Sequence, residues 1–234
     1  MNLVVDIGNS TAKAALFEGG GLVRTVEIED LKEVSFDGAI VVSTRSGHSE
    51  LERWIEERAR FFVRMDAATP VPITNLYATP ATLGCDRLAA AVGATAMFPG
   101  QAALVVDFGT AITFDLITAA GEFLGGNISP GARSRFRALH EFTGALPMGS
   151  LPDELCDFPA GETKTAIESG VVMGILAETE RYRELSQAKS GDLKVIFTGG
   201  DAEYFAGRVN FPIFVAPTLV FYGLNAILEH NANK

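Results

Sequence analysis

The 234-residue sequence contains little of what several large protein classes require. Its two cysteines, Cys85 and Cys156, cannot build a disulfide framework and lack the spacing of metal ligands. Its three histidines are scattered along the chain, which argues against a zinc site. No apolar run approaches the length of a membrane span, and the first residues lack the basic start of a signal peptide. We therefore expect a cytoplasmic protein.

Positive charge is also scarce. The chain has 19 lysines and arginines against 29 acidic residues, a formal net charge of −10, which argues against nucleic acid as a partner. An anionic substrate would need local attraction from a lysine, an arginine, helix N-termini or a metal ion. The densest basic cluster, Arg133, Arg135 and Arg137, would spread around a helix, so we interpret it as mostly a solvated face.

The composition that remains is typical of a globular α/β protein. Hydrophobic residues make up 47% and charged residues 21%, with 24 glycines and no low-complexity tract. At this length the chain could form one large domain or two small, closely packed ones, and either could bury a core.

The stretch from Asp107 to Asp115 predicts a strand, a tight turn and a second strand. Gly109 lets the backbone approach a bulky ligand, and Thr110 can donate to anionic oxygens. Asp107 could hold a cation that neutralises those oxygens. The alternative is an ordinary hairpin whose aspartate and threonine bond the turn backbone.

The same pattern opens the chain, from Leu3 through Asp6 and Gly8 to Phe17. Two such hairpins favour two related subdomains, residues 1–101 and 102–234, that present them to a shared cleft. In the first half, a β-β-β-α-β run is typical of a ribonuclease-H-like subdomain, and the second half repeats this architecture. We thus expect an α/β fold of two ribonuclease-H-like, actin-like ATPase subdomains with mixed sheets flanked by helices.

The expected elements follow from apolar periodicity and turn residues. Strands are expected at residues 2–7, 12–17, 22–28, 39–43, 61–65, 102–106, 112–117, 123–124 and 193–197. Helices are expected at 49–60, 132–142, 166–185 and 219–228, and a further helix is expected to start within residues 83–88 and to run to about 98. Residues 66–82 read as an irregular loop, and 125–131 as a turn that a ligand or another segment approaches closely.

Asp86 and Arg87 are expected in the first turn of a helix that follows this long loop. The aspartate could simply complement the helix dipole. The dipole does not explain an arginine in the same turn, so the adjacent acid and base form a candidate catalytic element.

Four motifs occur in one order, and together they resemble a type III pantothenate kinase of the acetate and sugar kinase, heat-shock ATPase and actin superfamily. They are Asp6-Ile7-Gly8-Asn9-Ser10, Gly84-Cys85-Asp86-Arg87, Asp107-Phe108-Gly109-Thr110 and Thr198-Gly199-Gly200, with the glycine-rich Gly125 to Gly131 segment between the last two. The resemblance spans essentially the whole chain. The P-loop and Gly-x-Gly-x-x-Gly motifs are absent from the sequence.

The resemblance implies ATP-dependent phosphorylation of the primary hydroxyl of pantothenate to 4'-phosphopantothenate, the first step of coenzyme A biosynthesis. It implies that Asp86 is the general base and Arg87 binds an anionic group. The implied pantothenate contacts are Tyr77, Gly84, Cys85, Asp86, Arg87 and Thr163, the last from a neighbouring subunit of a homodimer. The implied ATP contacts are Asp6, Ile7, Gly8, Asn9, Ser10, Thr11, Ala12, Lys13, Thr110, Gly199 and Gly200.

The same resemblance implies two kinds of cation. Asp6 would face the Mg²⁺ of MgATP, and Asp107 would bind a monovalent cation, K⁺ or NH4⁺. Two alternatives remain open from the residues: another small-molecule kinase of this fold, and a nucleotide-binding regulator without turnover. Retention of Asp86, Arg87, Asp107 and Lys13 argues against the regulator.

Overall fold

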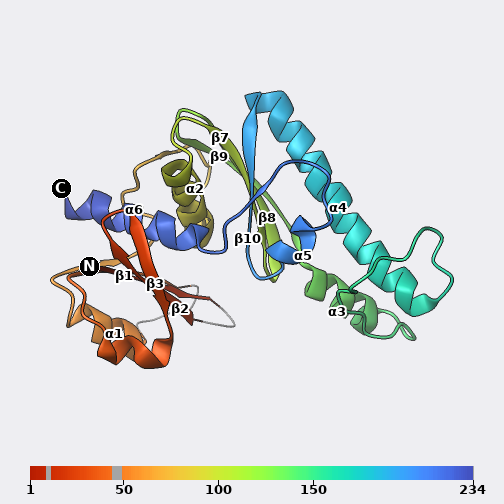
Figure 1. Ribbon diagram of the computed structural model, residues 1–234, viewed down its shortest axis with the longest axis horizontal. Coiled ribbons are helices and arrows are strands. Elements are labelled where there is room, and N and C mark those ends of the chain that lie inside the picture. The colour runs from red at the N-terminus through yellow and green to blue at the C-terminus, as the bar shows by residue number, and fades with distance from the viewer. Residues whose placement is uncertain (9–11, 44–48, 234) are drawn as a thin grey trace. The chain divides into compact units, whose positions relative to one another are not determined.

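The computed structural model describes the chain except for residues 9–11, 44–48 and 234. It divides into two compact units (Figure 1). The first unit holds residues 1–101, 117–125 and 218–234, and the second holds 102–116 and 126–217. One boundary coincides with the expected division after residue 101, whereas segments 117–125 and 218–234 group with the first unit. No helix in the described part of the chain is long and apolar enough to cross a membrane.

The first unit is built on a five-stranded sheet with the order β3-β2-β1-β4-β5. β1 pairs antiparallel with β2 and parallel with β4. The central strands β1 and β4 are buried on both faces, and the side chains of one face form a core that includes Leu3, Val5, Leu16 and Val41. The strands are β1 (Asn2–Ile7), β2 (Ala12–Glu18), β3 (Gly21–Val26), β4 (Gly38–Ser43) and β5 (Phe61–Arg64), and the 3-10 helix η1 (Ile28–Glu33) follows β3.

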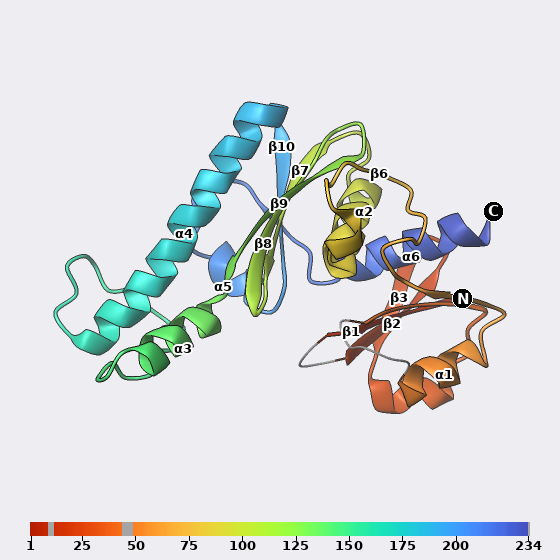
Figure 2. The same cartoon turned by 180° about the vertical axis from the view of Figure 1, so that it is seen from behind.

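Three helices cover this unit: α1 (Glu50–Glu56), α2 (Cys85–Met97) and α6 (Leu219–Ala232). Ser49 starts α1 with a capping box, in which its hydroxyl and Glu52 satisfy each other's backbone N–H groups. Figures 1 and 2 both show α2 and α6 side by side. Their backbones approach so closely that a Cβ at Gly93 would collide with Leu219 O, and one at Gly223 with Ala89 O. The last helix therefore packs against the first unit.

A six-stranded sheet has the order β11-β10-β7-β8-β9-β6. Read in reverse and without the edge strand β6, this order is β9-β8-β7-β10-β11, which repeats the order of the first sheet. The strands β7 to β11 therefore correspond, one by one, to β1 to β5. β10 is parallel to both β7 and β11, as β4 is to β1 and β5. The strands are β6 (Thr74–Asn75), β7 (Ala102–Phe108), β8 (Ala111–Ile117), β9 (Glu122–Pro130), β10 (Leu193–Thr198) and β11 (Phe214–Val215), and the 3-10 helix η2 (Pro80–Thr82) precedes α2.

The core of the second unit lies between its strands and the helices α3 (Ala132–Phe142), α4 (Thr163–Ser190) and α5 (Ala202–Ala206). Its centre is aromatic: the ring of Phe108 lies 4.8 Å from that of Phe197 and 4.7 Å from that of Phe205. These rings join β7, β10 and α5, and they fix the turn that follows β10.

The expected turn at 125–131 is wrong, because β9 continues through Pro130 and only Gly131 is the cap of α3. The expected close approach is confirmed: a Cβ at Gly126 would collide with Phe114 O, and one at Gly131 with Gly109 O. The solvated-face interpretation is wrong for Arg135. Its guanidinium binds Ser129 and Glu178 and donates to Pro130 O.

Candidate functional site

The carboxyl end of β1 carries Asp6, directly opposite Lys13 on β2. This register follows from the alternating apolar residues of both strands, which place Leu3, Val5, Ala14 and Leu16 in the core. Asp6 is half-buried, and Lys13 is exposed. The predicted contacts Asn9, Ser10 and Thr11 lie outside the described residues.

Asp86 lies in the first turn of α2, as the sequence predicts. Its Oδ1 accepts a 2.8 Å hydrogen bond from the backbone N–H of Arg87. The carboxylate folds back over Gly84, where a Cβ would collide with Asp86 Oδ1. Gly84 is therefore the residue that gives this carboxylate its room, and Cys85 lies half-buried between them.

Asp6 and Asp86 lie close enough in the first unit for their charges to interact. The pKa of Asp6 is raised from 3.8 to about 6: burial is the largest cause, the negative charge of Asp86 adds to it, and Lys13 opposes both effects. Two carboxylates that interact in this way attract a cation. The same surroundings raise the pKa of the Cys85 thiol, through burial first and then through Asp86 and Asp66, and so hold it as the neutral thiol.

Tyr77 and Arg87 form the second part of this site. The guanidinium of Arg87 lies 5.5 Å from the centre of the Tyr77 ring, and Arg87 is buried. Asn75 Oδ1 accepts from the Tyr77 backbone N–H at 3.0 Å, and the Phe123 ring lies 6.2 Å from the Tyr77 ring. Gly125, with a φ of 87°, leaves the space for that ring, since a Cβ there would lie 2.7 Å from it. We did not anticipate this supporting role of Gly125 from the sequence.

In the second unit, Asp107 is the second-to-last residue of β7 and pairs with Thr198, which ends the parallel strand β10. Parallel strands bring their carboxyl ends to one edge, so the two motifs meet there. Gly199 has a φ of 91°, and a Cβ at this residue would collide with Asp107 Oδ1 and Phe108 O. The Gly199–Gly200 turn is therefore packed directly on Asp107.

Thr110 lies in the two-residue connection between β7 and β8 and is exposed. Its carbonyl accepts from the backbone N–H of Gly131 at 3.0 Å and from Ser134 Oγ at 2.8 Å. These two bonds tie the start of α3 to the hairpin. Thr163, the remaining predicted contact, is exposed at the first residue of α4 in the second unit.

The donor chemistry of both carboxylates fits the cations that the sequence implies. Asp107 Oδ1 and Phe108 O lie around Gly199, and oxygen donors of this kind suit a hard monovalent cation. Asp6, whose charge is opposed by burial and by Asp86, would gain from a divalent cation. Within residues 1–8, 12–43 and 49–233, no three His, Cys, Asp or Glu side chains form a metal-binding group, so substrate oxygens would complete either coordination shell.

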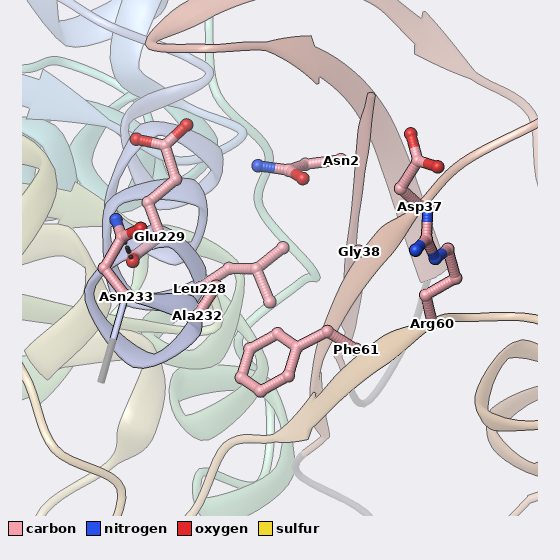
Figure 3. A pocket seen from close by; sticks show the side chains of 9 residues that line it. All are labelled: Asn2, Asp37, Gly38, Arg60, Phe61, Leu228, Glu229, Ala232 and Asn233. Atoms are coloured by element: carbon pink, nitrogen blue, oxygen red, sulfur yellow. Dashed lines mark hydrogen bonds between the residues drawn. The ribbon is translucent and has the colours of Figure 1, made fainter.

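A separate hollow of about 400 Å³ lies in the first unit, between the end of α6 and the amino ends of β1, β4 and β5 (Figure 3). Its charged groups are Asp37, Arg60 and Glu229, and Phe61 and Leu228 supply apolar surface. Ligands of α/β sheets bind beyond the carboxyl ends of the strands, where Asp6 lies. This hollow is at the other end of β1, and we assign it no function.

Comparison with known proteins identifies the family of this chain. The family model for type III pantothenate kinase matches residues 29–184. A type III pantothenate kinase of Porphyromonas gingivalis is 40% identical, over 98% of this chain and 98% of its own. Among solved structures, a Campylobacter jejuni protein described as a Baf family transcriptional activator is 24% identical, with a TM-score of 0.66 over 99% and 100% of the two chains.

A ROK hexokinase of Thermus thermophilus shares the fold at a TM-score of 0.52 and 14% identity, over 98% of this chain and 99% of that one. These two structural likenesses concern the fold alone, and they support the actin-like α/β architecture that the repeated strand order indicates. The family match and the near full-length identity go further: the chain belongs to the type III pantothenate kinase family.

Proposed function

We propose that this protein transfers the γ-phosphoryl group of ATP to the primary hydroxyl of pantothenate and so forms 4'-phosphopantothenate for coenzyme A biosynthesis. The observation that carries the proposal is the grouping of Asp6, Lys13, Asp86 and Arg87 in the first unit, with Asp86 close enough to raise the pKa of Asp6. A base, a cation-binding carboxylate and two positive charges are what phosphoryl transfer to an alcohol needs.

Asp86 is the proposed general base. A primary hydroxyl is a poor nucleophile, and a carboxylate within hydrogen-bond reach supplies roughly 10²–10⁴-fold of rate. Arg87 is the proposed partner of the pantothenate carboxylate. Its burial and its position over the Tyr77 ring restrict the guanidinium, which makes it a better-ordered anion receptor than a surface arginine.

The nucleotide is the proposed ligand of the two Asp-Gly hairpins. In the first unit, Lys13 would neutralise phosphate charge and Asp6 would hold the magnesium of MgATP. In the second unit, Thr110 would donate to phosphate, and the Gly199–Gly200 turn would receive the adenosine. Support comes from the repeated strand order, which gives both hairpins equivalent places at the carboxyl ends of their sheets.

A monovalent cation, K⁺ or NH4⁺, is the proposed ligand of Asp107. A carboxylate beside triphosphate would repel it unless a cation lay between them. A homodimer is the proposed assembly, with Thr163 contributing to the pantothenate site of the neighbouring subunit. Its exposure at the start of α4 leaves Thr163 accessible to a second chain.

The test is a coupled ADP-release assay with and without pantothenate, followed by mass spectrometry of the product. ADP release that depends on pantothenate, with a phosphorylated product, supports the proposal. Release that depends on a different alcohol would indicate another small-molecule kinase, and nucleotide binding without turnover on any alcohol would indicate a regulator. Light scattering of the purified protein tests the dimer independently.

A further inference from the structure

The turn after β10 places a carboxylate, Asp201, at the edge where the second unit presents its Asp-Gly hairpin. The backbone N–H of Asp201 donates to Phe108 O at 3.1 Å. Gly199, two residues earlier, is packed against Asp107 Oδ1 and Phe108 O without room for a Cβ. These contacts fix the position of Asp201 relative to Asp107 and to the hairpin turn that carries Thr110.

The side chain of Asp201 does not do what an aspartate at this position usually does. It precedes the short helix α5, yet within the described structure its carboxylate accepts no capping hydrogen bond from that helix. The carboxylate is half-buried. Burial raises its pKa, and the positive charge of Arg133, in the first turn of α3, opposes the effect. A partly desolvated carboxylate that leaves its local donors unused is suited to a ligand that brings donors of its own.

The surroundings decide which donors these are. Phosphate oxygens would be repelled by a carboxylate, and the proposed function places them at Thr110 on the neighbouring hairpin turn. A metal ion is also unsuited, because the positive charge of Arg133 already acts on this carboxylate and would repel a second cation. Vicinal hydroxyl groups remain: each donates one hydrogen bond, and a carboxylate has two oxygens to accept them.

We propose that Asp201 accepts hydrogen bonds from the ribose hydroxyls of the bound nucleotide and makes the enzyme prefer ribonucleotides to deoxyribonucleotides. The proposal rests on the proposed function, in which the neighbouring Gly199–Gly200 turn receives adenosine. Asp201 would then lie between the base and the phosphates, where a nucleotide carries its ribose. Arg133 would act as a positioning residue that keeps the carboxylate ionised.

The experiment is a ligand–variant cycle. Dissociation constants of ATP, 2'-deoxyATP and 3'-deoxyATP are measured by titration calorimetry for the wild type, Asp201→Asn, Asp201→Ala and the control Glu203→Gln. Glu203 is an exposed carboxylate two residues further along the same helix, which makes it a matched control. Because hydrogen bonds to charged groups are the stronger class, the wild type and the control should bind ATP about 10- to 100-fold more tightly than at least one deoxynucleotide.

In Asp201→Ala this preference should fall to about twofold or less, because ATP binding weakens while deoxynucleotide binding hardly changes. Asp201→Asn keeps one side-chain oxygen, so its preference for ATP over the deoxynucleotides should lie between those of the wild type and Asp201→Ala. This variant also provides the test if Asp201→Ala does not fold. Equal weakening of all three nucleotides would show that Asp201 only supports the turn and would overturn the proposal. Equal binding of all three nucleotides by the wild type would overturn it as well, as would an absence of ATP binding.

The pantothenate-dependent ADP assay separates this inference from the proposed function. Normal turnover without ribose discrimination would reject the role of Asp201 and leave the kinase intact. If the protein discriminates between ribose and deoxyribose but does not phosphorylate pantothenate, the role of Asp201 would stand and pantothenate would be rejected as the substrate.

Discussion

Replacing Asp6 by asparagine should stabilise the ligand-free protein at neutral pH, and it should also remove the carboxylate that is proposed to bind the magnesium of MgATP. Burial and, to a smaller extent, the negative charge of Asp86 raise the pKa of Asp6 from 3.8 to about 6. The folded state therefore binds this proton more tightly than the unfolded state does. At about 1.4 kcal/mol for each pKa unit, ionised Asp6 costs the folded protein up to ~3 kcal/mol.

The sign of this effect sets its pH window. Below pH ~4, Asp6 is protonated in both states and costs nothing. The cost grows as the pH rises through the interval from ~4 to ~6, and it is complete above the folded pKa. Asparagine cannot ionise, so the stability advantage of Asp6→Asn should be near zero at pH 4 and largest above pH 6.

The assay is urea unfolding of both proteins from pH 4 to 8 in EDTA without nucleotide. Asp37→Asn is the contrasting control: the bond from the Met1 amino group lowers the pKa of the exposed Asp37 carboxyl, so its stabilising effect is already largely present at pH 4, and this variant should show no stability advantage that grows between pH 4 and 8. Asp86→Asn should lower the pKa of Asp6 and shrink the effect. Equal unfolding midpoints for wild type and Asp6→Asn at pH 8 would refute the reasoning, as would an advantage that is the same at pH 4 and pH 8.

Three further results are expected. Asp86→Asn should lower turnover by ~10²–10⁴-fold with nearly unchanged ATP affinity by calorimetry; near-normal turnover would leave Asp86 only a role at the helix start. Replacing K⁺ and NH4⁺ by Na⁺ should reduce the ADP-release rate, because a smaller ion fits a potassium site poorly; an unchanged rate would count against Asp107 as the cation ligand. Gly223→Ala should destabilise the protein by ~1–3 kcal/mol in urea unfolding, because its Cβ would collide with Ala89 O between α2 and α6; an unchanged midpoint would show that the helices can separate without cost.

Local patterns in the sequence predicted most elements of this fold. The β1–β2 hairpin, β4, α2 and α3 lie where alternation, apolar runs and turn residues indicate them. The Asp-Gly turn at Gly109 and the place of Asp86 in the first turn of α2 were also predictable, because a carboxylate at the end of an apolar strand or at a helix start is a local feature. The helix α4 extends beyond its predicted ends, since tertiary packing on the core supports turns that propensity alone leaves marginal.

Contacts between distant segments decided the rest. Glycines and a proline favour a turn at 125–131, but pairing within a sheet holds this stretch in β9, and the glycines serve close approach to Tyr77, Phe114 and Gly109. The sequence predicts a solvated Arg135, but in the fold its guanidinium donates to Ser129 and to Glu178, which is distant in sequence. The final helix joined the first unit because Gly223 fits the backbone of α2.

The sequence by itself determined which residues carry chemistry, because carboxylates, glycines and an arginine at strand and helix ends are visible in one dimension. Only the tertiary structure decided how they influence one another. The raised pKa of Asp6 depends on its burial and on Asp86, and the order of Arg87 depends on the Tyr77 ring. The accessible carboxylate of Asp201 depends on a turn held by Phe108. Charge interaction, burial and packing act through distance in space, which residue order does not specify.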